Sequence, residues 1–437
     1  MIGRLIDLSS GSNRRILKGM FLVTIFMVIG KVIAAAKEVV VAYEYGVSVY
    51  LDIYLLGFVL VLWIPSVLAS VIQATLVPLL NSAETDDQTA FSSQLFGVSI
   101  LVATFLGVAL FVLAPYALDL FNSRLDQSNF DLSVTVFRLL VPVAVLQILI
   151  SLFSAELLAR EKHANTLYES LPSLVLLVIV FLFSAGAKDI YVLVIGTVFG
   201  YFLQLLCLLL TLIRYQFWAG ISFRLNSYLW VEFRRSISVL FLGTLVVSLV
   251  IPIDQYLASS LGEGAVSSLS YATKLLILFV GLGVTVVSRS ILPVLSSQNY
   301  DQLEKANICM VWSFRVFCLG AVGLIVGWPL APWIVSTLFE RGEFGSDSTM
   351  IVVDAFRYGL LQLPFLYAGM VLIQFFASTR RQNVIAMSGL VAVIVKILTG
   401  FILASSMGLS GITLSTSLMY FATYIFFLYS IRTLDVK

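Results

Sequence analysis

The chain has 437 residues, of which 60% are hydrophobic and only 11% are charged, and its formal net charge is +2. Soluble globular proteins carry about a quarter charged residues, so this composition excludes an ordinary soluble domain. The small net charge gives no basis for nucleic-acid binding. One histidine, and three cysteines within apolar runs, give none for a metal site. The sequence shows no nucleophile–base, Walker or dinucleotide motif, which argues against an enzyme.

Long apolar runs recur from end to end, and a helix needs roughly 20 apolar residues to cross a bilayer. The sequence therefore predicts an all-α polytopic membrane protein with about twelve transmembrane helices. The first run is too long for a signal-peptide core and is expected to be retained. The expected spans are 18–43, 51–80, 92–121, 132–158, 165–185, 189–213, 236–260, 266–297, 306–339, 349–378, 383–406 and 408–431.

Basic residues gather in alternate loops, which predicts the orientation of the chain. Arg14 and Arg15 precede the first span, Arg160 and Lys162 follow the fourth, and the connection 214–235 holds four arginines. Loops rich in lysine and arginine stay in the cytoplasm, so both termini are expected there. Aromatic residues interleave with the charges of 214–235, which favours an amphipathic helix at the cytoplasmic interface.

The chain repeats itself at a nearly constant offset. Leu-Ala-Pro115-Tyr recurs as Leu-Ala-Pro332-Trp (332 − 115 = 217), and Phe-Arg138 recurs as Phe-Arg357 (357 − 138 = 219). Six spans in each repeat give both halves the same orientation, so two pseudo-symmetric lobes should alternate access to a central cavity. The predicted domains are an N-lobe at 1–213, a cytoplasmic interfacial linker at 214–235 and a C-lobe at 236–437.

Three lysines lie within predicted spans, where a charge costs at least ~2.5–3.5 kcal/mol and usually serves a function. Lys31 and Lys37 lie in the first span, and Lys274 lies in the eighth. A helical rise of ~1.5 Å per residue places Lys37 and Lys274 roughly 9 Å and 12 Å below the outer surface. Three ammonium groups on one cavity would suit a phosphate or pyrophosphate headgroup. The alternative is that they snorkel or pair with carboxylates.

Other charges within the spans have two interpretations. Glu38 and Asp254 occupy equivalent positions (254 − 38 = 216), and Asp52 opens the second span. These acids could balance the lysines or bind a coupling ion. Arg138 and Arg357 could face the cavity or anchor helix ends. A lone Lys396 in span eleven receives no role. No cofactor is expected; coupling to an H⁺ or Na⁺ gradient, or to the membrane potential, stays open.

Several segments resemble one family. The stretch Asp254–Leu275 resembles the span seven–eight signature of the MurJ/MviN-type lipid II flippases, and Gly30–Asp52 and Leu338–Phe344 resemble two further motifs of that family. The resemblance implies the fold of the multidrug/oligosaccharidyl-lipid/polysaccharide exporter superfamily. It also implies flipping of an undecaprenyl-pyrophosphate-linked sugar across the bacterial inner membrane, from the cytoplasmic to the outer leaflet. The three lysines would contact the pyrophosphate.

The sequence departs from that family's pattern in ways that bear on the cargo. Lysines replace its usual arginines, Ile277 replaces a carboxylate, the apolar stretch Trp63–Leu68 replaces a basic pair, and twelve spans are counted against fourteen. We therefore expect a Wzx-like flippase for an O-antigen, capsule or exopolysaccharide unit. Expected partners are that lipid-linked saccharide, membrane lipid, and a polysaccharide polymerase or glycosyltransferases. The alternatives are a lipid II flippase and a cation-coupled multidrug antiporter.

Overall fold

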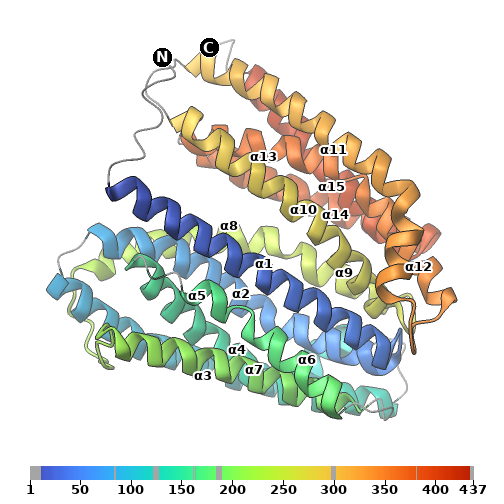
Figure 1. The fold of residues 1–437 in the computed structure, drawn as a ribbon, viewed down its shortest axis with the longest axis horizontal. Coiled ribbons are helices and arrows are strands. Elements are labelled where there is room, and N and C mark those ends of the chain that lie inside the picture. Colours follow the sequence, from blue (N-terminus) through green and yellow to red (C-terminus); the bar gives the residue numbers. More distant parts are fainter. Residues whose placement is uncertain are drawn as a thin grey trace. The chain divides into compact units, whose positions relative to one another are not determined.

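The computed structural model describes residues 11–82, 85–121, 127–160, 162, 164–183, 189–296, 302–379 and 381–433. Within these residues the regular structure is entirely α-helical (Figure 1). The helices are α1 (Gly11–Tyr45), α2 (Val49–Ser82), α3 (Thr85–Phe121), α4 (Gln127–Ala159), α5 (Ala164–Tyr168), α6 (Leu171–Phe183), α7 (Ile190–Arg214), α8 (Leu229–Ser248), α9 (Val250–Ser259), α10 (Ala265–Ser296), α11 (Gln302–Phe339), α12 (Ser346–Leu360), α13 (Leu363–Ser378), α14 (Gln382–Met407) and α15 (Leu409–Arg432).

Each expected span falls on one of these helices or on a consecutive pair. Among the described residues, nine helices are long and apolar enough to cross a membrane, and the bent pair α12–α13 makes a tenth. The charged α1 and the long α10 account for the other two expected spans. The prediction of an all-α polytopic membrane protein is confirmed.

Three expected spans are interrupted, and each interruption has a proline just after it. Pro172 is the second residue of α6, Pro252 the third of α9 and Pro364 the second of α13. Proline has no N–H group, which the first turn of a helix does not need, but it breaks the hydrogen-bond ladder of a helix interior. Each of the second segments, α6, α9 and α13, thus begins with a proline in its first turn, where the missing N–H costs no hydrogen bond.

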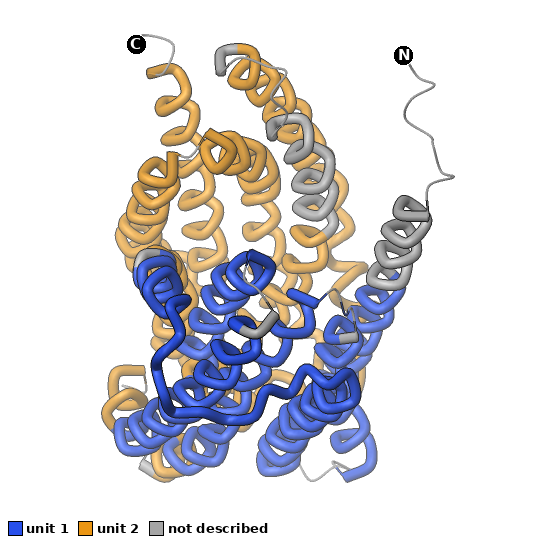
Figure 2. Tube along the Cα trace, turned by 90° about the vertical axis from the view of Figure 1, so that its left-hand side faces the viewer, with its two compact units in different colours: residues 1–44, 61–115, 134–241 blue, residues 45–60, 116–133, 242–437 orange. Residues whose placement is uncertain are grey.

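The chain forms two compact units (Figure 2). Unit 1 comprises residues 1–44, 61–115 and 134–241, and unit 2 comprises 45–60, 116–133 and 242–437. Unit 2 therefore includes the turn between α1 and α2 together with the first residues of α2. The lobe boundaries derived from the sequence repeat stay a prediction.

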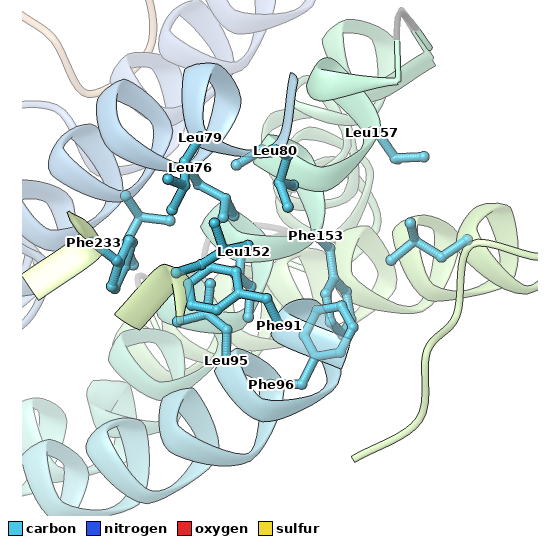
Figure 3. Packing of buried hydrophobic residues seen from close by; sticks show 14 of the residues in the cluster. Leu76, Leu79, Leu80, Phe91, Leu95, Phe96, Leu152, Phe153, Leu157 and Phe233 are labelled. Atoms are coloured by element: carbon cyan, nitrogen blue, oxygen red, sulfur yellow. The ribbon is translucent and has the colours of Figure 1, made fainter. Parts of the chain in front are cut away.

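The hydrophobic core of unit 1 gathers side chains from α2, α3, α4, α7 and α8 (Figure 3). Phe91 is fully buried at its centre. The ring of Phe91 lies 5.1 Å from that of Trp230 and 5.6 Å from that of Phe233, both edge-to-face. Aromatic pairs in this geometry contribute about 0.5–1.5 kcal/mol beyond their buried area. These contacts fix the start of α8 against α3.

The connection before α8 is not the amphipathic helix expected from its sequence. Residues 217–227 are non-helical, and α8 begins only at Leu229. The buried Gln94 of α3 holds this segment: its amide nitrogen donates to Asn226 Oδ1 (2.6 Å), and its carbonyl accepts from Trp230 Nε1 (2.8 Å) and Ser227 N (3.3 Å). Polar groups of the segment are thus satisfied by α3 instead of by helical neighbours.

Candidate functional site

The two lysines of α1 differ in their surroundings. The Lys31 side chain is exposed. Lys37 forms an ion pair with Glu38, with Nζ and Oε1 2.6 Å apart, and the two side chains are 20% and 13% exposed. Of the two lysines, Lys37 is therefore the one with a carboxylate partner beside it, and Lys31 is the exposed one.

Lys274 lies in the first half of α10, in unit 2. Its ammonium is 5.5 Å from the centre of the Tyr271 ring, one helical turn away. Tyr271 is 1% exposed, and its hydroxyl donates to the Gly46 carbonyl (3.2 Å). A cation over an aromatic face is stabilised by about 0.5–2 kcal/mol, so the buried ring gives the lysine a fixed platform.

Asp52 binds the beginning of α10. Its Oδ2 accepts from Gly264 N (2.6 Å), and its Oδ1 accepts from Ser267 N (2.7 Å). The first N–H groups of a helix have no partner within the helix, and a carboxylate there also meets the positive end of the helix dipole. These contacts make Asp52 the cap of α10. Ion coupling by this residue stays a prediction.

Gly46 allows the turn before α2 to meet the loop before α12. Its φ is +55°, and an added Cβ would collide with the Glu343 backbone carbonyl. In the same loop, the ring of Phe344 lies 5.3 Å from that of Tyr271. Three segments that carried the family resemblance, at 46–52, 264–274 and 339–344, therefore lie together within unit 2.

Arg138 satisfies a backbone carbonyl that a proline leaves open. Pro115 of α3 has no N–H to donate to the carbonyl four residues earlier, which belongs to Phe111. Arg138 Nε of α4 donates to that oxygen (3.3 Å), and its guanidinium lies 4.9 Å from the Phe111 ring. Inside a membrane such an unpaired carbonyl is costly, so this contact supports the anchoring interpretation of Arg138.

The second repeat forms the same contact. Pro332 of α11 leaves the Trp328 carbonyl open, and Arg357 Nε of α12 donates to it (3.1 Å). The guanidinium lies 5.9 Å from the Trp328 ring and 3.9 Å from an oxygen of the exposed Asp354. The repeat read from the sequence thus recurs as a repeated contact in the structure.

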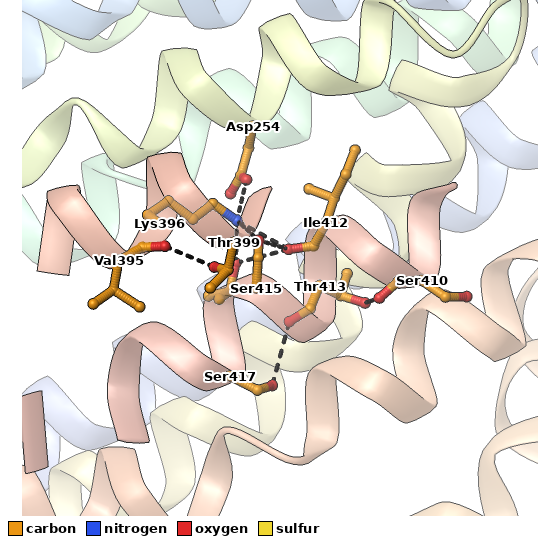
Figure 4. Close-up of polar contacts among 10 residues, drawn as sticks. Asp254, Val395, Lys396, Thr399, Ser410, Ile412, Thr413, Ser415 and Ser417 are labelled. Carbon is orange, nitrogen blue, oxygen red and sulfur yellow. Dashed lines mark hydrogen bonds and ion pairs between the residues drawn. The ribbon is translucent and has the colours of Figure 1, made fainter. Parts of the chain in front are cut away.

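Asp254 is paired with a residue to which the sequence assigned no role. Its Oδ1 lies 2.5 Å from Lys396 Nζ, and Lys396 is fully buried (Figure 4). Asp254 lies on α9 and Lys396 on α14, both in unit 2. The sequence signal was a single lysine in the middle of an apolar run; its partner is not visible there because the two positions are far apart.

One large apolar groove lies in unit 1. It has a volume of about 980 Å³ and is lined by α3, α4 and α7, through residues such as Val108, Val145, Val198 and Phe202. Its lining carries no charged side chain, so it does not suit an anionic headgroup.

The predicted headgroup-binding lysines are divided between the units: Lys31 and Lys37 belong to unit 1, and Lys274 belongs to unit 2. Their convergence on one anion stays a prediction.

Comparison with known proteins identifies the family. Residues 41–436 match the sequence profile described as "Lipid II flippase MurJ". The chain belongs to the MurJ family of lipid II flippases. The family resemblance seen in the sequence is confirmed, and the chain is a transporter rather than an enzyme.

Two curated relatives agree with this assignment. The chain is 25% identical to the "Probable lipid II flippase MurJ" of Vibrio cholerae, over 94% of this chain and 81% of that protein. It is also 25% identical to the "Lipid II flippase MurJ" of Burkholderia cenocepacia, over 89% of this chain and 78% of that protein.

Solved structures show the fold. A "Lipid II flippase MurJ, inward closed conformation" superposes with a TM-score of 0.83 at 18% identity, covering 94% of this chain and 87% of that one. An inward-facing multidrug resistance transporter of the MATE family and MOP superfamily superposes with a TM-score of 0.71 at 14% identity, covering 92% and 96%. The chain therefore has the fold of the exporter superfamily expected from the sequence.

The expectation of an O-antigen, capsule or exopolysaccharide unit as cargo is wrong, because the profile and the curated relatives are those of lipid II flippases. Two of the departures that suggested it carry little weight in choosing the cargo. Lysine in place of arginine keeps the positive charge and gives up only the bidentate geometry. The number of spans does not determine which headgroup the protein binds.

Proposed function

We propose that this protein is a lipid II flippase that moves undecaprenyl-pyrophosphate-linked peptidoglycan precursor from the cytoplasmic to the outer leaflet of the bacterial inner membrane. The observation that carries the proposal is the match of residues 41–436 to the MurJ profile. The intramembrane lysines Lys31, Lys37 and Lys274 support it, because cations within a bundle suit a pyrophosphate group. The proposal includes cytoplasmic termini, which the excess of lysine and arginine in alternate loops supports.

The lysines act as point charges in this proposal. An ammonium presents a compact, strongly hydrated charge, so it attracts pyrophosphate without fixing its orientation. Lys37 Nζ already lies 2.6 Å from Glu38 Oε1. A pyrophosphate that binds Lys37 must therefore compete with the Glu38 carboxylate for the ammonium. Alternating exposure of these charges to the two leaflets would carry the headgroup across. Enzymes that synthesise or polymerise the lipid-linked saccharide are the expected functional partners.

The test is rescue of bacteria depleted of their own lipid II flippase. The wild-type chain should restore growth and the arrival of lipid II at the outer leaflet, and Lys31→Ala or Lys274→Ala should abolish both at normal membrane levels. Lys274→Arg should retain function, because it keeps the charge. Lys305→Ala, at the start of α11, is the matched control and should rescue. Failure of the well-expressed wild type would contradict the proposed function. Full rescue by both alanine variants would contradict the role of the lysines in headgroup binding.

A further inference from the structure

Lys396 is the best-buried charge of the described part of unit 2. It lies in the middle of α14, and none of its surface is exposed. A lysine at the centre of a membrane span costs at least ~2.5–3.5 kcal/mol on insertion scales. Lysines near helix ends extend their long side chains to water at the membrane surface. Lys396 is instead packed among the helices of unit 2. The protein must therefore compensate this ammonium internally.

Four oxygen atoms surround the ammonium (Figure 4). Lys396 Nζ donates to the carbonyl of Ile412 (2.9 Å), to Ser415 Oγ (2.8 Å) and to Thr416 Oγ1 (2.7 Å), and Asp254 Oδ1 lies 2.5 Å away. The oxygens come from α9 and α15, whereas the ammonium comes from α14. One carboxylate, one carbonyl and two hydroxyls are oxygen ligands of the kind that hard cations take in proteins.

A small cavity lined by both aliphatic and polar side chains opens beside this group. It has a volume of about 200 Å³, and its lining includes Asp254, Gln362, Thr413, Thr416 and Tyr420. Asp254 and Tyr420 are the titratable side chains that line it. The cavity is large enough for several water molecules, so small ions have space next to the Asp254 carboxylate. The position between the four oxygens is nevertheless taken by the ammonium.

We propose that Lys396 is a built-in monovalent cation: its ammonium fills an oxygen cage formed by Asp254, Ile412, Ser415 and Thr416 and excludes free alkali cations from it. Truncation of the side chain would open the cage to Na⁺ or K⁺. The cage itself follows from the contacts of unit 2. Its consequence for transport, independence from Na⁺ at this position, rests on the proposed function.

Thermal unfolding of the purified full-length protein tests the cage without any assay of transport. Melting is measured in sodium, potassium and choline chloride at equal ionic strength. The wild type should melt at the same temperature in all three salts. Lys396→Ala should melt lower in choline and recover by a few degrees in a saturable way with Na⁺ or K⁺, because a ligand that binds only the folded state raises its stability. Asp254→Asn/Lys396→Met removes both charges at similar volume and should show no specific cation effect.

Two results would overturn the proposal. One is a Na⁺-dependent rise in the melting temperature of the wild type that Asp254→Asn abolishes, since a free cation would then bind in spite of the lysine. The other is a folded Lys396→Ala that no alkali cation stabilises more than choline. If Lys396→Ala does not fold, the wild type and Asp254→Asn decide by the first criterion. A cation response in Lys396→Ala with no rescue by the wild type in flippase-depleted cells would support the cage and contradict the proposed function.

Discussion

The contact between Arg138 and the Phe111 carbonyl makes a quantitative prediction. The side-chain hydrogen bond is 3.3 Å long and exposed, so its loss in Arg138→Ala should cost about 1 kcal/mol, the usual net value. The guanidinium also lies 4.9 Å from the Phe111 ring, which adds about 0.5 kcal/mol. We expect a total loss of about 1.5 kcal/mol in unfolding free energy.

The cost should depend on Pro115. In Pro115→Ala, residue 115 regains an N–H that donates to the Phe111 carbonyl, so the arginine is no longer needed there. Arg138→Ala should then cost only the remaining ~0.5 kcal/mol, which leaves a coupling energy of about 1 kcal/mol between the two positions. In a domain of 150–250 residues, 1 kcal/mol shifts the melting temperature by roughly 2–4 °C.

The assay is thermal unfolding of the two single variants and the double variant in detergent. The second repeat provides a replicate. Arg357 Nε donates to the Trp328 carbonyl (3.1 Å), so substitutions of Arg357 and Pro332 should be coupled in the same way. The mixed cycle of Pro115→Ala with Arg357→Ala is the control, because positions without shared partners should be additive. Additive effects in both matched cycles, within about 0.3 kcal/mol, would refute the reasoning.

Three further predictions concern the scaffold of the site and are measured as melting temperatures, with proteolysis as a second measurement for the last. Asp52→Asn should lower the unfolding free energy by about 1 kcal/mol, because one of its two acceptor oxygens and its negative charge at the start of α10 are lost. The same change at Asp354, whose ion pair with Arg357 is exposed, should have little effect, and equal effects would contradict the cap. Gly46→Ala should cost roughly 1–2 kcal/mol from its left-handed backbone alone, and Gly243→Ala, at an open helical position, should be neutral or stabilising. Gln94→Leu should cost about 1–3 kcal/mol and accelerate proteolysis of the loop that follows α7; unchanged cleavage would show that other contacts hold this loop.

The sequence predicted the helices well because hydropathy is a local property. Every expected span contains a helix, since a bilayer-length apolar run has few alternatives to helix formation. Breaks within three of these spans coincide with Pro172, Pro252 and Pro364, but prolines also lie inside unbroken helices, so the sequence alone did not predict which spans break. The non-helical form of 217–227 was missed because its partners lie on α3, more than 100 residues earlier.

The candidate site was predicted in part. Parts of the segments that carried the family resemblance, at 46–52, 264–274 and 339–344, lie together in unit 2. The lysine of one of them, Lys274, is held over a buried ring. The contacts of single charges were less predictable. Asp52 and Arg138 were read as candidate cavity charges because a charge in a span suggests function. The structure gives each of them a backbone partner on another helix, and sequence spacing does not reveal which distant backbone group a side chain will reach.

The repeat separates charges that both halves need from charges that only one half has. Arg138 and Arg357 perform the same task at equivalent prolines, so they belong to the scaffold of each half. The equivalent carboxylates Glu38 and Asp254 do not: Glu38 pairs with its neighbour Lys37, whereas Asp254 pairs with Lys396 on another helix. The repeat offset of 217 to 219 places Lys396 opposite the aliphatic stretch 177–179, so the first half has no counterpart of this ammonium. A scaffold role would serve both halves alike. Lys396 has no equivalent in the first half, so the Asp254–Lys396 cage is the specialised feature of the second half. For that reason, substitutions at Lys396, rather than at the duplicated arginines, are the ones that should alter the response to cations.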